Sequence, residues 1–93
     1  TYINHTLDVL ERLAERYGDH PALHGIEALN EPRWDIPTDL LKRFTRAAYE
    51  RIRRHCPAER VGVVFHDGFR SFREYAGFLQ APEFANVVLD IHR

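Results

Sequence analysis

A helical pattern followed by an apolar segment occurs three times along this chain of 93 residues. Apolar residues first recur at helical spacing over residues 3–17, and residues 23–29 then have the character of a strand. A second helical stripe is expected over residues 37–57, where Pro57 ends it because proline cannot continue a helix. The apolar run that follows, within residues 60–65, is typical of a strand buried on both faces, as in a parallel sheet.

The third repeat begins at Ser71, which has the capping-box spacing with Glu74. It predicts a short helix that Pro82 ends and a third strand over residues 87–91. No tight hairpin signal separates the strands, so the order predicts an α/β fold with parallel strands. From order alone, part of a (β/α)₈ barrel and a doubly wound open sheet are both compatible with the chain.

The ends and the length indicate that this is one piece of a larger domain. The chain has no Met, opens inside a predicted helix, and stops directly after a predicted strand. Three strands cannot close a barrel, since a complete one needs about 250 residues. We therefore expect residues 1–93 to be an internal part of a single domain, truncated at both ends.

Composition excludes several classes of function. Thirteen basic and 14 acidic residues give a formal net charge of −1, so no global field attracts nucleic acid or an anionic membrane. The basic run that contains Arg53 lies at a helix end and is expected on a solvated face. The single cysteine forms no internal disulfide or cysteine-based metal motif, and no apolar run approaches the roughly 18 residues of a membrane span. No cofactor is expected, while localisation and oligomeric state stay open.

Polar side chains follow each predicted strand. Asn30 and Glu31 come after the first strand, His66 and Asp67 after the second, and His92 after the third. In parallel α/β folds, the carboxyl ends of the strands form the ligand-binding edge. The sequence therefore predicts one site to which all three strands contribute.

Glu31 is the leading catalytic candidate within this site. Pro32 disfavours helical backbone angles at the preceding residue, so an extended Glu31 is expected at the strand end. The alternative is a helix cap or an ion pair with Arg33. Composition and spacing alone leave these two readings equally supported.

Three segments resemble a known family. The segment of residues 25–32, which ends in Asn-Glu-Pro, resembles the strand-four signature of glycoside hydrolase family 5. Residues 64–69, with His-Asp-Gly-Phe, and residues 87–92 resemble strands five and six of fungal-type exo-β-1,3-glucanases in that family. In these relatives a His-x-Tyr motif follows strand six. The resemblance implies a partial (β/α)₈ barrel, reaching from about helix three to strand six.

The resemblance also implies a retaining glycosidase that acts on β-linked glucan or β-glucosides, with Glu31 as the acid/base. The nucleophilic glutamate of the family stands on strand seven, beyond this chain, so the 93 residues alone should be inactive. Glu27 is expected to be a structural group that points into the barrel. Substrate-binding roles fall on these residues: Asn30 at the sugar 2-hydroxyl, His92 beside the nucleophile, Phe69 as an aromatic face for a sugar ring, and Asp67 and His66 at the strand-five edge.

Two alternatives come from other classes of protein. A metal-dependent barrel hydrolase would use Glu31, His66, Asp67 and His92 as ligands, although no His-x-His or His-Glu-x-x-His pair is present. A catalytically inactive barrel would bind carbohydrate without cleaving it. Trp34, just past the Asn-Glu-Pro motif, is an additional candidate for stacking on a sugar.

Overall fold

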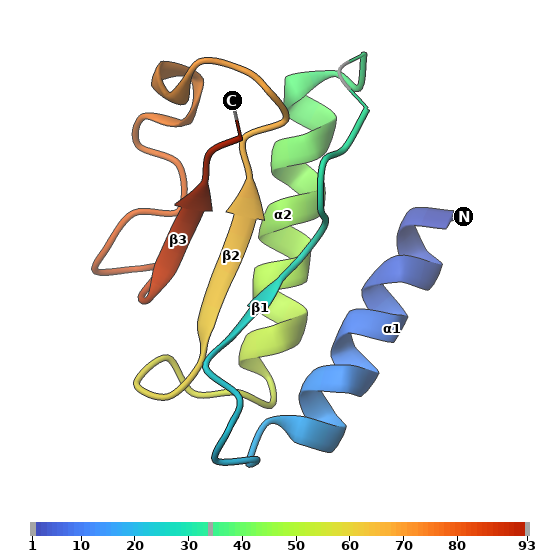
Figure 1. Ribbon diagram of the computed structural model, residues 1–93, viewed down its shortest axis with the longest axis vertical. Coiled ribbons are helices and arrows are strands. Elements are labelled where there is room, and N and C mark those ends of the chain that lie inside the picture. Colours follow the sequence, from blue (N-terminus) through green and yellow to red (C-terminus); the bar gives the residue numbers. More distant parts are fainter. Residues whose placement is uncertain (1, 34, 93) are drawn as a thin grey trace.

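The computed structural model describes residues 2–33 and 35–92, which form a sheet with helices beside it (Figure 1). Trp34 lies outside the described residues. The strands are parallel, in the order β1-β2-β3, which confirms the predicted α/β fold with parallel strands. The elements in chain order are α1 (Tyr2–Tyr17), β1 (Gly25–Glu27), α2 (Thr38–Arg53), β2 (Gly62–His66), the 3₁₀ helix η1 (Phe72–Tyr75) and β3 (Val87–Asp90).

The two α-helices bury the apolar stripes that predicted them. On α1 the stripe is buried in its middle, at Leu7, Leu10 and Ala14, whereas Ile3 and Tyr17 near its ends are exposed. α2 ends at Arg53, before the predicted stop at Pro57, yet its stripe continues into Cys56, which is fully buried. Within the described ranges, neither these helices nor η1 has the length and apolar character needed to cross a membrane.

The two faces of the sheet differ, because alternate residues of a strand point to opposite sides. Register pairs Ile26 with Val63 and Val63 with Val87, and these three pack with α2 in one apolar cluster. We call this side, which also carries Ala28, Phe65 and Leu89, the helix-covered face. The other side, the open face, carries Glu27, Val64, Val88, His66 and Asp90.

The third helix differs from its prediction. η1 is one turn of 3₁₀ helix, and the Ser71 hydroxyl accepts from the backbone N–H of Arg73. The Glu74 carboxylate does not complete a capping box, since it accepts instead from the Thr38 hydroxyl at 3.1 Å. Gly77 and Leu79 have positive φ angles of 76° and 49°, which no right-handed helix accommodates. These left-handed residues turn the chain before it reaches Pro82.

Arg53 corrects the expectation of a solvated basic face. Its guanidinium donates to the carbonyl oxygen of Val61 at 2.7 Å, beside the amino end of β2. It also donates to the carbonyl oxygen of Ala85 at 2.8 Å, just before β3. Longer bonds reach the carbonyls of Cys56 and Asn86. One side chain of α2 thus ties together the segments that enter β2 and β3.

Candidate active site

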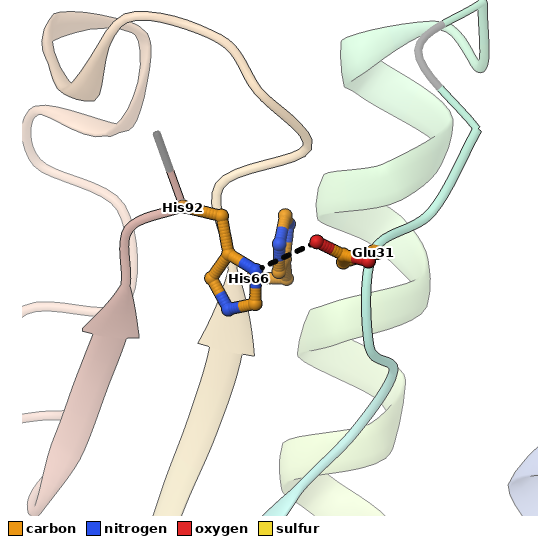
Figure 2. A group of neighbouring side chains, drawn as sticks. All are labelled: Glu31, His66 and His92. Atoms are coloured by element: carbon orange, nitrogen blue, oxygen red, sulfur yellow. Dashed lines mark hydrogen bonds and ion pairs between the residues drawn. The ribbon is translucent and has the colours of Figure 1, made fainter.

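The carboxyl ends of the three strands bring Glu31, His66 and His92 together (Figure 2). Each of the three offers a nitrogen or oxygen atom, and these atoms lie within 4.8 Å of one another. Glu31 follows β1, His66 is the last residue of β2, and His92 follows β3. The convergence of three strand ends at one edge, as predicted from the sequence, is what a parallel sheet produces.

His92 lies between two carboxylates. Its Nδ1 is 3.0 Å from Oε2 of Glu31, and its Nε2 is 2.8 Å from Oδ2 of Asp90. A neutral imidazole carries only one N–H and would leave a lone pair facing one of these oxygens. The hydrogen bond with Glu31, and then that with Asp90, raise the pKa of His92 above its ordinary value. The geometry therefore favours an imidazolium that donates in both directions.

The backbone of Glu31 corrects the expectation of an extended residue. Its φ angle is +46°, in the left-handed region that non-glycine residues rarely adopt. Such a conformation costs on the order of 1–3 kcal/mol and persists only where surrounding contacts enforce it. Arg33, the alternative ion-pair partner, binds Asp35 at 2.9 Å instead. The Glu31 side chain is half exposed and turns to His92.

His66 is buried and its tautomer is fixed by the backbone. Its Nδ1 accepts the N–H of Gly68 at 2.8 Å, so the ring carries its hydrogen on Nε2. That Nε2 is buried and has no hydrogen-bond partner among the described residues. Gly68 has a φ angle of +63°, and a Cβ there would lie 2.9 Å from a methyl of Leu41. The positive φ at the sharp turn after β2 thus favours glycine, and the turn sets the orientation of the histidine.

Asp67 and its neighbours build the rest of this turn. Asp67 is fully buried, and its Oδ1 accepts the N–H of Phe69 at 2.9 Å, while the Tyr75 hydroxyl donates to its backbone oxygen. Phe69 is half exposed, and its ring meets His66 edge to face at 5.0 Å. Asn30 is exposed next to Glu31. The substrate contacts expected of Asp67, Phe69 and Asn30 stay predictions.

The same three side chains have the composition of a metal site, but their hydrogen bonds compete with that use. A divalent ion such as Zn²⁺ needs an unprotonated nitrogen from each histidine. The lone pair on Nδ1 of His66 accepts from Gly68, and its Nε2 carries the hydrogen. Both nitrogens of His92 face carboxylates. Hydrogen bonding and coordination exclude each other here, and the observed geometry is the hydrogen-bonded one.

Two further residues complete the site: Asp90, to which the sequence assigned no role, and Glu27, which was expected to be a structural group. Asp90 binds Nε2 of His92, the ring nitrogen that does not contact Glu31, and this hydrogen bonding lowers the pKa of the Asp90 carboxyl. Burial raises the pKa of Glu27, and a hydrogen bond with Asp90 raises it further. As pH falls, Glu27 therefore takes up a proton before Asp90 does. The period-two alternation of Val88, Asp90 and His92 is the sequence signal that would have identified Asp90.

A parallel α/β sheet with titratable groups at the carboxyl ends of its strands is the arrangement typical of enzymes built on this class of fold. No protein-family model matches the chain. Comparison with curated proteins relates it to glucan 1,3-beta-glucosidases of fungi.

Three of these relatives are similar over almost the whole of this chain. The glucan 1,3-beta-glucosidase of Schwanniomyces occidentalis is 32% identical over 94 residues, covering 97% of this chain and 22% of the relative. A probable glucan 1,3-beta-glucosidase A of Aspergillus niger is 32% identical, covering 97% and 21%. Glucan 1,3-beta-glucosidase 2 of Wickerhamomyces anomalus is 30% identical, covering 92% and 21%. The chain therefore spans about a fifth of the length of the curated relatives it matches.

Proposed function

We propose that this chain belongs to a glycoside hydrolase of family 5 that cleaves β-1,3-glucan or β-glucosides with retention, and that Glu31 is its acid/base. The observation that carries the proposal is the placement of Glu31, half exposed at the carboxyl edge of a parallel sheet and hydrogen-bonded to His92 at 3.0 Å. The similarity to fungal glucan 1,3-beta-glucosidases supports the substrate class.

The mechanism needs two carboxyl groups roughly 5–5.5 Å apart. Glu31 protonates the glycosidic oxygen as the leaving group departs, while the second carboxylate attacks the anomeric carbon and forms a glycosyl-enzyme. Water then attacks that intermediate, and Glu31 accepts its proton. We assign the nucleophile to a glutamate outside these 93 residues, so the chain alone should not catalyse the reaction.

The open face of the sheet supports the barrel part of the proposal. Three parallel strands, covered by helices on one side only within the described residues, match part of a (β/α)₈ barrel whose interior is the other side. In such a barrel the carboxyl ends of the strands form the substrate site. Asn30 would then bind the sugar 2-hydroxyl, His92 would line the sugar site, and Phe69 would offer its ring to a sugar. His66 and Asp67 complete the edge.

The test is Glu31→Gln in the complete enzyme, assayed on two substrates. Hydrolysis of a laminari-oligosaccharide, whose leaving group needs a proton, should fall about 10²–10⁴-fold. Formation of the glycosyl-enzyme from a dinitrophenyl β-glucoside should be nearly unaffected, because that leaving group departs without a proton. A single-turnover measurement of dinitrophenol release separates this step from the later attack of water.

Glu59→Gln is the matched control, since Glu59 is an exposed carboxylate in the loop before β2. It should retain activity on both substrates. Full activity of Glu31→Gln on the oligosaccharide would remove the acid/base assignment. Tight binding of the glucan by the unaltered protein without any hydrolysis would instead indicate a carbohydrate-binding barrel.

A further inference from the structure

The strongest unassigned feature is a row of four titratable side chains that come from β1, β3 and the segments after them. Glu27 on β1 meets Asp90 on β3, Asp90 meets Nε2 of His92 at 2.8 Å, and Nδ1 of His92 meets Glu31 at 3.0 Å. Glu27 and Asp90 lie on the open face of their strands, and His92 follows β3 two residues after Asp90. We infer that Asp90, supported by Glu27, is a positioning residue that holds His92 against Glu31. This inference rests on the proposed function of Glu31.

The two ends of the row differ in rigidity. Glu31 lies in the loop after β1, with a strained backbone and a half-exposed side chain. Asp90 lies on a strand whose neighbour β2 is paired with it from Val63 to His66. Groups on strands are held more accurately than groups on loops. The sheet therefore fixes the position of Asp90, Asp90 orients the imidazole of His92, and the imidazole in turn positions the carboxylate of Glu31.

One hydrogen bond would not achieve this. A histidine held only at Nδ1 can still swing about its Cα–Cβ bond, and it can present either a hydrogen or a lone pair to its partner. The second bond, from Nε2 to Asp90, fixes the ring plane and favours a hydrogen on both nitrogens. The ring of His66, with its centroid 4.1 Å from that of His92, fills the adjacent side. Among residues 2–33 and 35–92, the titratable groups that face His92 are therefore Glu31, Asp90, His66 and, beyond Asp90, Glu27.

The row also accounts for the opposite pKa shifts of two neighbouring carboxyl groups, raised at Glu27 and lowered at Asp90. Glu27 and Asp90 would repel each other if both were ionised and nothing compensated their charge. The imidazolium of His92 provides a positive charge on one side of Asp90, and hydrogen bonding with it keeps the pKa of Asp90 low. The proton taken up first is then held by Glu27, the more enclosed of the two. Asp90 thus stays an acceptor for His92.

The experiment is Asp90→Asn in the complete enzyme, with Asp19→Asn as its matched control. Asn keeps the shape and an oxygen acceptor but removes the charge, whereas Asp19 is a fully exposed aspartate in the loop after α1. Histidine titration followed by NMR, with His92 assigned through His92→Gln, should show the midpoint of His92 moving to lower pH. The control should leave it unchanged. This readout does not depend on catalysis, so it stays informative if Glu31 proves not to be the acid/base.

Kinetics provide the second readout. The kcat/KM for a laminari-oligosaccharide should fall between about tenfold and about a hundredfold, the range expected when an orienting partner is lost. Release of dinitrophenol from the activated glucoside should change far less. In a Glu31→Gln background the Asp90→Asn change should add almost nothing, since the two act through one path.

An unchanged His92 midpoint, or an equal loss on both substrates with full additivity to Glu31→Gln, would overturn the inference. Thermal unfolding of each variant shows whether the fold is retained. If Asp90→Asn unfolds the enzyme, Glu27→Gln is the second variant. It should move the His92 midpoint in the same direction by a smaller amount, and no movement would count against the row.

Discussion

The two faces of the sheet use the same strands for opposite purposes. On the helix-covered face, Val63 is fully buried and Phe65 packs its ring against Tyr75 and Phe78. On the open face, Val88 is 49% exposed and Glu27 and Asp90 carry charge or protons. Because successive residues alternate between faces, each strand contributes in turn to stability and to chemistry.

The difference between the two faces predicts which property of the protein a substitution on each face should alter. The helix-covered face carries apolar side chains and no ionisable side chain of the sheet, so its contribution is apolar burial and packing. The open face has little apolar burial within the described residues, and its organisation comes from hydrogen bonds between titratable groups. Substitutions on the first face should change stability, whereas those on the second should change activity and pH dependence.

The largest expected effect on stability is for Ile52→Ala. Ile52 is fully buried on α2 within the cluster that covers β2. Truncation leaves a cavity and should lower the free energy of unfolding of the complete protein by about 2–5 kcal/mol. Denaturant unfolding measures the loss, and kcat per folded molecule should be unchanged. A large fall in kcat at full folding would mean that the two faces are not separable.

A smaller effect is expected for Val88→Ala, and its size tests the barrel. If the open face is the interior of a (β/α)₈ barrel, Val88 becomes packed by the remaining strands. Its truncation should then cost on the order of 1–3 kcal/mol, well above that of a half-exposed valine. Denaturant unfolding of the complete protein, as for Ile52→Ala, measures this change in the free energy of unfolding. A loss below about 0.5 kcal/mol is typical of a surface substitution. It would indicate that the open face is exposed to solvent and would contradict the barrel.

The smallest effect is a pH dependence that belongs to the open face alone. The pKa of His92 is raised above the ordinary 6.5 by its bonds to Glu31 and Asp90. Because the pKa of His92 is higher in the folded than in the unfolded protein, protonated His92 stabilises the fold. This contribution is complete below pH 6.5 and is lost as pH rises through the folded pKa. The difference in unfolding free energy between the unaltered protein and His92→Gln should therefore narrow with rising pH. A constant difference between about pH 5.5 and about pH 8.5 would contradict the imidazolium.

Regular periodicity made most of the fold predictable. The stripes of α1 and α2 and the apolar run of β2 follow from burial alone, and their order gave the parallel sheet. The hydrogen bonds of Arg53 were not predictable, because their acceptors include carbonyl oxygens from a distant segment. The positive φ of Glu31 was also hidden, since the residue before a proline normally avoids such angles.

The candidate site was predictable in its members but not in its connections. Strand ends located Glu31, His66 and His92, since parallel strands bring their carboxyl ends together. The hydrogen bond from Gly68 to His66 was not foreseeable, because it depends on the turn conformation after β2. Asp90 was assigned to the strand and not to the site, although alternation puts it on the same face as His92.

The tie made by Arg53 has a consequence for how this region can change in length. It holds the carbonyls of Val61 and Ala85, so the register of β3 on β2 is set at their amino ends. A residue inserted or deleted within β3 would shift every later side chain by one position and exchange the faces. After an insertion, Ile91 would meet Glu31 in place of His92, and Leu89 would replace Asp90; after a deletion, Ile91 would replace Asp90. Length changes should therefore be confined to the stretch between η1 and β3, upstream of the Arg53 tie.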